Sequence, residues 1–419
     1  MNASVWADQG VSLSPPRTAV PNEADVVIIG AGYTGLHAAR ELAKRGRQVA
    51  VLEQGNIGDG ASGLNFGSAA LGVAAPYSSL SKRYGPAFAR ATAALSTRVL
   101  DDFCQFISVE QIKCDLQKTG HLTIALNQRQ LTQLARSKAT LDELVDNELV
   151  LISRQRLKEH LEIDSACGGL FNPNSYAINP VSYLQGLVKL AFRAGAGIFE
   201  GIKVQEVNRI GDKLFEVRCD GNTLRSRDVI VCTNGVLLPG FSPSARGIVP
   251  INSYLIATEV LSETAARNVG KPVFATAHLV PSYFRLTSDN RLLFGSRKNF
   301  AAEPLPSRDT KELVVRMHAL LPFTRDLRVT HSWSGKLGFT FNRLPHVGVA
   351  DGIYYAIGYC GKGIPWSAFC GIAVANLVAD GVTPEPPIAT PLIRRWFYNG
   401  SRGFLHPLSW YCRVVDRLS

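Results

Sequence analysis

The chain has 419 residues, of which 46% are hydrophobic, and its formal net charge is +11. It is long enough for two domains with a large core, and no apolar run reaches the ~18 residues that span a bilayer. Its eight cysteines form no Cys-x-x-Cys pair, which argues against a metal site or a disulfide framework and favours the cytoplasm. The positive charges are spread along the chain, which favours a solvated basic surface over a nucleic-acid partner.

The chain opens with a predicted arm, followed by a strand–helix–strand unit. Residues 1–23 are polar and contain prolines, without the apolar core of a signal peptide. The apolar run 24–29 predicts a buried parallel strand. The segment 36–45 predicts an amphipathic helix that Gly46 closes, and 48–52 predicts a second strand. This order is the unit that binds dinucleotides when its first turn is rich in glycine.

The first turn reads Gly30-Ala31-Gly32-Tyr33-Thr34-Gly35, and Glu53 directly follows the second strand. Gly30 permits a tight turn, Gly32 lets the backbone approach a pyrophosphate, and Gly35 lets the helix pack close to the sheet. The helix N-terminus would hold the phosphates. Glu53 would accept hydrogen bonds from ribose hydroxyls, which favours FAD or NAD over NADP. A glycine-rich turn in an ordinary α/β protein is the alternative, and the complete unit argues against it.

A stretch of small residues after Glu53 favours FAD. Residues 58–68 include Gly60-Ala61-Ser62-Gly63 and Asn65, as a second close approach of the backbone to a ligand would need. Here the chain resembles the FAD-dependent D-amino-acid-oxidase superfamily, and within it the γ-glutamylputrescine oxidoreductase-like amine oxidases. In that branch Gly-Ala-Ser-Gly-Arg-Asn-Gly-Gly lies beside the pyrophosphate and the isoalloxazine, whereas this chain has Leu64 for Arg and Phe66 for Gly.

The resemblance continues along the chain in the order of the family's motifs. Residues 4–6 are similar to an opening Ser-Tyr-Trp, 233–235 to the end of Ala-Thr-Asn-Gly, and 358–363 to Gly-Tyr-Ser-Gly-His-Gly. A cysteine that tethers flavin in sarcosine oxidases falls on Gly335, so noncovalent FAD is expected. The resemblance implies that these residues contact FAD: Gly30, Gly32, Tyr33, Thr34, Gly35, Glu53, Gln54, Gly60, Ala61, Ser62, Leu64, Asn65, Phe66, Gly67, Val204, Thr233, Asn234, Gly235, Gly335, Gly338, Gly358, Gly361, Lys362, Gly363 and Ile364.

The predicted fold class is α/β, with a Rossmann-type FAD-binding domain and an antiparallel-sheet substrate domain. The FAD domain is expected to have a parallel sheet with helices on both faces. It would be discontinuous, formed by 24–97, 160–245 and 330–390, with 98–159 and 246–329 forming the substrate domain. The tail 391–419 interleaves basic and aromatic residues, and it either docks on the body, as in relatives, or contacts a membrane surface.

The resemblance implies oxidation of a C–N bond in an amine or amino acid. Hydride would pass from the carbon beside a neutral amine to flavin N5, and the resulting imine would hydrolyse. The helix predicted after Gly363 would point its positive end at the reduced flavin, with Lys362 in the place of the family's His. Leu293 stands where relatives that react with oxygen have Lys, so the acceptor is O₂ or, as Leu293 favours, a quinone.

The expected substrate site combines one cation with aromatic walls. Arg285 is the candidate for a substrate carboxylate because a guanidinium grips carboxylates with two hydrogen bonds; a structural ion pair is the alternative. Four aromatic residues are candidate walls for the amine and would otherwise be plain core: Tyr254, Tyr283, Trp333 and Trp366.

Two other readings remain open at this point. One is a tRNA-modifying FAD oxidoreductase, which the basic charge favours and the lack of a clustered basic stripe disfavours. The other is a protein in which FAD is purely structural.

Overall fold

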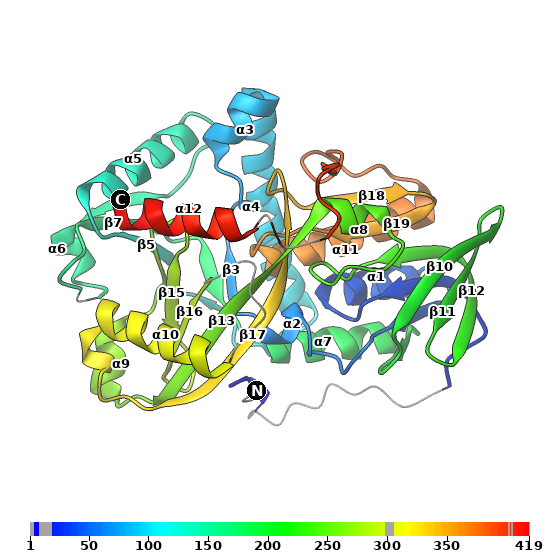
Figure 1. Ribbon diagram of the computed structural model, residues 1–419, viewed down its shortest axis with the longest axis horizontal. Coiled ribbons are helices and arrows are strands. Elements are labelled where there is room, and N and C mark those ends of the chain that lie inside the picture. The colour runs from blue at the N-terminus through cyan, green and yellow to red at the C-terminus, as the bar shows by residue number, and fades with distance from the viewer. Residues whose placement is uncertain are drawn as a thin grey trace.

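The computed structural model describes residues 4–7, 19–161, 163–297, 306–400, 403 and 405–418. Two large sheets lie side by side in it, one on each side of the molecule (Figure 1). Most of the predicted arm at 1–23 lies outside the described residues. The predicted α/β architecture, with a Rossmann-type domain beside an antiparallel sheet, is confirmed.

The first sheet is built on the predicted strand–helix–strand unit. Its strands follow the order β10-β11-β12-β1-β2-β9, and β19 pairs with β12 and β18. The strands β12, β1, β2, β9 and β19 run parallel to their partners in this core, whereas β10, β11 and β18 add antiparallel edges. The bounds are β1 Glu23–Ile29, β2 Val49–Leu52, β9 Gly197–Phe199, β10 Val204–Gly211, β11 Leu214–Cys219, β12 Asn222–Val231, β18 His346–Ala350 and β19 Ile353–Ile357.

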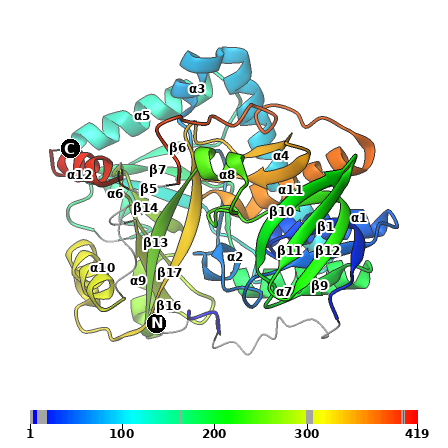
Figure 2. The same cartoon turned by 45° about the vertical axis from the view of Figure 1, so that its right-hand side comes forward.

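Helices cover one face of this sheet. Alternation along β1 sends Val26 and Ile28 into a core shared with α1, α4, α7 and α11, whereas Val27 and Ile29 point to the other face. That other face packs against side chains of β10, β11 and the segment that leads into the short α8, whereas the long helices lie on the first face (Figure 2). The bounds are α1 Tyr33–Lys44, α4 Pro86–Val109, α7 Pro180–Arg193, α8 Ser242–Gly247 and α11 Gly363–Asp380.

The second sheet has the order β17-β13-β16-β15-β14-β5-β7-β6 and is antiparallel except between β14 and β5. One face is covered by α6, α9 and α10, which share a core with Ile256, Phe284 and Phe294. The bounds are β5 His121–Ala125, β6 Val150–Ser153, β7 Gly168–Asn172, β13 Ile248–Val260, β14 Val273–Thr276, β15 Ser282–Leu286, β16 Arg291–Ser296, β17 Val329–Thr340, α6 Arg154–Leu157, α9 Glu263–Val269, α10 Pro306–Leu320 and the 3₁₀ turn η2 Pro322–Thr324.

The sheets divide the chain differently from the predicted domains at three places. Strands β7 and β17 belong to the second sheet, whereas the sequence predicts nearly all of their residues in the FAD domain. Helix α4 packs on α11 in the core of the first domain, although its second half was assigned to the substrate domain. Which sheet a strand joins depends on its pairing with strands distant in sequence. The hydrophobic periodicity of a single segment carries no information about that pairing.

Smaller elements connect the two bodies. A small sheet has the strand order β3-β8-β4. Helix α2 lies within the small-residue segment that precedes β3, and α3 and α5 are further helices. The bounds are β3 Ser68–Ala70, β4 Gln117–Lys118, β8 Ser175–Ala177, α2 Ala61–Leu64, α3 Tyr77–Tyr84 and α5 Gln128–Asp142.

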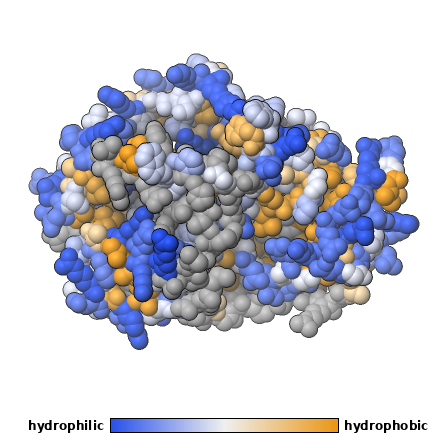
Figure 3. Space-filling model, in the orientation of Figure 1, coloured by the Kyte–Doolittle hydropathy of each residue, from blue (hydrophilic) through white to orange (hydrophobic). Residues whose placement is uncertain are grey.

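The tail docks on the body through buried and hydrogen-bonded residues. The buried Tyr398 hydroxyl donates to the Ile248 carbonyl at 2.8 Å, and the Asp416 carboxylate of α12 (Leu405–Leu418) accepts the Leu279 amide at 2.7 Å. Trp396 stays exposed, and the face seen in Figure 3 carries its hydrophobic residues in separate patches among hydrophilic ones. By length and composition α11 could cross a membrane, although half of it is buried in the body, where it packs on α1.

Candidate active site

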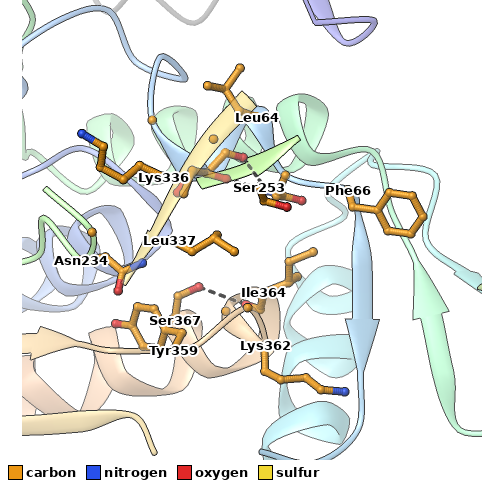
Figure 4. Close-up of a pocket in the computed structure, with 18 of the residues that line it drawn as sticks. Leu64, Phe66, Asn234, Ser253, Lys336, Leu337, Tyr359, Lys362, Ile364 and Ser367 are labelled. Atoms are coloured by element: carbon orange, nitrogen blue, oxygen red, sulfur yellow. Dashed lines mark hydrogen bonds between the residues drawn. The ribbon is translucent and has the colours of Figure 1, made fainter. Parts of the chain in front are cut away.

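A cavity of about 1820 Å³ is lined by residues of both large sheets. The β1–α1 turn, the segment before β3, β13, β17 and the start of α11 all line it. Figure 4 shows Leu64 beside Lys336 and Ser253, with Ser367 and Tyr359 across the pocket from them. Among the predicted cofactor contacts, all but Gly35, Gly338 and Gly358 line this cavity. Segments far apart in sequence therefore meet around one space that is large enough for a dinucleotide and a small ligand.

The glycine turn has the geometry that a pyrophosphate requires. Gly30 has φ +105°, which favours glycine, and a Cβ on Gly35 would lie 2.0 Å from the Gly30 carbonyl oxygen. Helix α1 begins after Gly32 without a side-chain cap. The Tyr33 amide donates to the Ser62 hydroxyl, so the next amides of this turn are the ones that an anion would meet, and the helix dipole favours negative charge there.

Glu53 occupies the end of β2, where a ribose would lie. Its carboxylate oxygens accept the Ala31 amide at 3.0 Å and the Gly55 amide at 3.3 Å. Burial raises the pKa of Glu53, and the backbone hydrogen bonds act against that rise. These bonds fix the carboxylate in place at the position where the fingerprint predicts an acceptor for ribose hydroxyls.

Asn65 holds the small-residue segment in its curved path. Its amide nitrogen donates to the Ser62 carbonyl at 2.8 Å and to the Tyr33 hydroxyl at 3.1 Å, and its oxygen accepts the Gly67 amide at 2.9 Å. Ser62 in turn accepts the Tyr33 amide at 3.1 Å, which ties this segment to the glycine turn. The two predicted phosphate-binding segments therefore form one rigid wall.

Strand alternation decides which side chains of the second sheet face the cavity. Ser253 on β13 pairs with Gly335 on β17, and both line the cavity. Tyr283 lies on the same face, where Gly295 leaves room for its ring, and its hydroxyl is hydrogen bonded to the Ser253 hydroxyl. Tyr254 points to the opposite face, into the core under α10. The expectation that Tyr254 forms a wall is therefore wrong, because adjacent residues of a strand face opposite sides.

Arg285 also lies outside the cavity. Its three guanidinium nitrogens donate to the carbonyls of Phe66 at 3.0 Å, Leu286 at 3.1 Å and Ile178 at 2.8 Å. Burial lowers the pKa of Arg285 to about 10. Because these donors are already used by the backbone, the structure replaces the expected carboxylate site with a clamp that fixes the segment around Phe66.

The two tryptophans are supports as well. The Trp333 indole donates to the Leu64 carbonyl at 3.0 Å, and the Trp366 indole donates to the Gly72 carbonyl at 3.0 Å. Both rings are buried and neither lines the cavity, so the plain-core alternative holds for them. Gly338 and Gly358 also support the site from outside the cavity. Both contact the Asn234 side chain, whose oxygen accepts a hydrogen bond from the Gly358 amide at 3.0 Å.

Lys362 lines the cavity immediately before α11, which begins without a side-chain cap. Its ammonium group donates to the Leu71 carbonyl at 3.3 Å, and Figure 4 shows its chain extending away from Leu337. Burial, together with nearby Arg297, lowers the pKa of Lys362 to about 8. Burial also lowers the pKa of His121, another wall residue, to about 3, so this imidazole is neutral at physiological pH.

Sequence reasoning missed His121 and Arg297, which both line the cavity. Arg297 follows β16 two residues after Gly295, so strand alternation places it on the cavity face. That signal becomes readable only once the pairing of β16 with β13 is known. No group of three or more metal-ligating side chains occurs in the part of the chain that the structure describes, and the seven cysteines described there are free.

The glycine turn and Glu53 form a dinucleotide-binding site, and the same cavity continues along β13 and β15 with room for a small molecule. This arrangement is typical of a cofactor-dependent oxidoreductase. The model of the FAD dependent oxidoreductase family, DAO, matches residues 25–377, and the chain belongs to that family. It is an enzyme that uses FAD, related to amine and amino-acid oxidases.

Individual relatives cover most of the chain. The probable oxidoreductase OrdL of Haemophilus influenzae is 34% identical over 377 residues, which are 87% of this chain and 84% of the relative. Gamma-glutamylputrescine oxidoreductase of Escherichia coli is 29% identical over 84% of this chain and 83% of its own length. The glycine oxidase structure from Geobacillus kaustophilus superposes with a TM-score of 0.75 at 20% identity, covering 90% of this chain and 100% of that one.

The residues present fit FAD. The uncapped start of α1 suits the pyrophosphate, Glu53 suits a ribose without phosphate, and the uncapped start of α11 suits the electron-rich edge of a flavin. The hydroxyl of Thr233 is buried at the cavity wall without a hydrogen-bond partner, as a ligand-binding group would be.

Lys362 should make the stability of the cofactor-free protein depend on pH. Its pKa falls from 10.5 to about 8 on folding, so between these values the unfolded chain binds more protons and the free energy of unfolding rises with pH. At pH 7 the folded chain carries the full cost of the buried charge. We therefore expect Lys362→Met to be more stable than the wild type at pH 7, with an advantage that shrinks towards pH 10. Urea unfolding measures it, with exposed Lys336→Met as control; a pH-independent advantage would contradict the assignment.

Proposed function

We propose that the enzyme oxidises the C–N bond of a small amine or amino acid to an imine, which water then hydrolyses. The observation that carries this proposal is the single cavity in which the dinucleotide cradle meets the polar face of β13 and β15. Bound FAD supplies the acceptor for the hydride that leaves the carbon. The relatives named above support an amine or amino acid as the substrate.

The chain's own residues bind, orient and shield the reactants. The Ser253 and Tyr283 hydroxyls, hydrogen bonded to each other, offer a fixed polar contact on the sheet face. Burial raises the pKa of Tyr283, which keeps its hydroxyl neutral. The positive end of α11 would favour negative charge on a reduced flavin beside it, and the walls of the cavity would position the amine.

Anaerobic mixing with a panel of amines and amino acids tests the proposal. We expect at least one compound to abolish the absorbance of the oxidised flavin and to yield an aldehyde or keto product. Dithionite reduction serves as the control that the bound flavin is redox-competent. If dithionite reduces the flavin and no member of the panel does, C–N oxidation is not the activity.

The FAD is proposed to be noncovalent. Gly335 offers no side-chain atom for a tether, and the Cβ of Leu64 comes within 3.4 Å of where a Gly335 side chain would begin. We expect acid precipitation of the holoenzyme to release all FAD into the supernatant. Yellow flavin that stays with the pellet after washing would show a covalent bond.

A quinone rather than O₂ is the proposed electron acceptor. Leu293 is fully buried with Leu255 and Trp333, so its position supplies no positive charge that could stabilise superoxide. Stopped-flow reoxidation of substrate-reduced enzyme should be slower with air-saturated buffer than with a soluble quinone. Reoxidation in air that keeps pace with turnover would make the enzyme an oxidase. Lys362→Met would then show whether Lys362 of the cavity wall supplies the charge.

A tRNA-modifying oxidoreductase is the second candidate, and the net charge of +11 favours it. Such an enzyme should bind tRNA with an affinity that falls steeply as salt rises, because binding releases counterions from the phosphates. Absence of salt-dependent tRNA binding at low ionic strength would leave the small-amine substrate as the proposal.

A further inference from the structure

The cavity continues past β15 into a distal pocket, which is the part lined by residues from the ranges 121–137 and 273–281. Cross-strand pairing places Thr123 on β5 beside Ala275 on β14, and Ala275 beside Tyr283 on β15. All three line the cavity, whereas Phe274 points into the core that α10 covers. Because neighbouring strands lie ~4.8 Å apart, the distal pocket extends about 10 Å beyond Tyr283.

One face of α5, at the upper left in Figure 1, also lines the distal pocket. Gln130, Gln133, Leu134 and Ser137 line it, and their spacing places them on one side of the helix. Helix α5 packs on β5 and β7, so this side meets the cavity face of the sheet. Gln133 and Ser137 are exposed, whereas Gln130 is buried. The distal pocket therefore runs from solvent, between α5 and the sheet, towards Tyr283.

The described side chains that line the distal pocket include no aspartate, glutamate, lysine or arginine. Burial lowers the pKa of His121 to about 3 and lowers that of His278, so both imidazoles are neutral at physiological pH. The charges that act on these imidazoles lie outside the distal pocket and belong to Lys362, Asp416 and Arg316. A charged ligand group would thus lose water without gaining a counter-ion, which favours an uncharged group.

Gln130 supplies the distal pocket with an unused hydrogen-bond donor. Its side-chain oxygen accepts the Leu126 amide at 2.9 Å, which fixes the orientation of the side-chain amide. Its Nε2 atom is buried and has no hydrogen-bond partner among the described residues. Since Gln130 is only 1% exposed, water does not compensate this donor freely. A buried donor left unpaired is costly, so it points to an acceptor that arrives with a ligand.

We infer that the distal pocket binds the tail of an elongated substrate, and that the natural substrate is an amine whose chain ends in an uncharged carbonyl group, such as an amide. The carbonyl oxygen would accept the free hydrogen of the Gln130 amide. An extended chain of about eight bonds spans the distance from Tyr283 to Thr123. This inference rests on the proposed function for the amine end, while the carbonyl end can be tested without turnover.

The first test compares amines of similar length and different ends. Anaerobic flavin reduction of the holoenzyme is followed with 6-aminohexanamide, heptylamine and 6-aminohexanoate. We expect the largest kred/Kd for the amide, because heptylamine leaves the Gln130 donor unpaired and the carboxylate would lie in an uncharged pocket. A larger kred/Kd for 6-aminohexanoate or for heptylamine would overturn the inference.

Gln130→Met tests the proposed hydrogen bond. It should lower the ratio of kred/Kd for 6-aminohexanamide to that for heptylamine by about 3- to 10-fold, the range for a neutral hydrogen bond. Because both amines meet the same variant, any loss of stability cancels in this ratio. The matched control is Gln128→Met, since Gln128 is exposed on the same helix and does not line the cavity. An equal ratio in the two variants would reject the role of Gln130.

Ala275→Phe tests the distal pocket itself, since its ring would fill the space between Thr123 and Tyr283. The ratio of kred/Kd for 6-aminohexanamide to that for 3-aminopropanamide should fall by about tenfold or more. Ala139→Phe, at an exposed position of α5 that does not line the cavity, should leave the ratio unchanged. Equal losses for the long and the short amide in Ala275→Phe would show a route of entry only and would overturn the inference.

A titration without turnover separates this inference from the proposed function. If no amine reduces the flavin, the proposed function fails, and calorimetric titration of the holoenzyme with hexanamide decides the inference. Hexanamide should bind, and Gln130→Met should weaken its binding by about 3- to 10-fold, whereas Gln128→Met should not. Absence of binding, or equal affinities in the two variants, would overturn the inference.

Discussion

Replacement of Gly32 by valine should yield a folded protein without bound flavin. A side chain on Gly32 would enter the space beside the uncapped start of α1, where its Cβ would already lie 2.8 Å from the Ser62 hydroxyl. Valine would therefore occupy the place of the pyrophosphate and displace the hydroxyl that accepts the Tyr33 amide. Flavin absorbance per mole of purified protein measures the loss, and circular dichroism shows whether the fold is retained.

Gly211→Val is the matched control. Gly211 lies at the end of β10 in an exposed hairpin, where the nearest atom to a new Cβ, on Leu214, is 3.6 Å away. This variant should carry as much FAD as the wild type. A yellow Gly32→Val protein with full FAD content would show that the glycine turn does not hold the pyrophosphate.

Arg285→Met should destabilise the protein by about 3 kcal/mol, because it leaves three carbonyl acceptors without a donor in a buried site. Arg285 is only 5% exposed, so water cannot replace the lost hydrogen bonds without opening the structure. The loss should also loosen the segment around Phe66 and weaken FAD binding. Urea unfolding of the cofactor-free protein measures the first effect, and FAD titration measures the second.

Arg328→Met separates this clamp from a general effect of losing an arginine. Arg328 pairs with Glu259 at 3.4 Å at the edge of the same sheet, and its side chain is 76% exposed. The expected change in unfolding free energy is within about 0.5 kcal/mol. If Arg285→Met is equally mild and shifts only the KM for acidic substrates, the clamp is not the role of Arg285, and the sequence-based expectation of a carboxylate site returns.

The FAD cradle was predictable because its parts are local in sequence. Strand β1, the glycine turn, α1 and β2 occupy one continuous unit. Gly30 is favoured by its φ of +105° and Gly35 by its contact with the Gly30 carbonyl, whereas Gly32 contacts Ser62 of the next segment. The Asn65 segment follows directly and closes on the same turn through Ser62 and Tyr33. Short-range geometry therefore determined these positions, and the resemblance to the family extended the prediction to the start of α11.

The substrate side could not be predicted in the same way, since distant strands build it. Tyr254 and Tyr283 look equivalent in sequence, yet the register of β13 with β16 and β17 turns Tyr254 to the core under α10. Alternation along β15 places Arg285 and Tyr283 on one face. Only the packing of Phe66 over that face decides that Arg285 is a clamp.

The sequence by itself thus determined the cofactor and the family, and it predicted the wall proposed for the dinucleotide, because those features depend on residues close together in the chain. The tertiary structure alone decided which cation faces the cavity. The Arg285 guanidinium donates to three backbone carbonyls, so its nitrogens are not available to a ligand. The Nε atom of Arg297 has no hydrogen-bond partner among the described residues, and Arg297 lines the cavity. Hydrogen-bond satisfaction is a property of the assembled fold, so residue type and spacing cannot supply it.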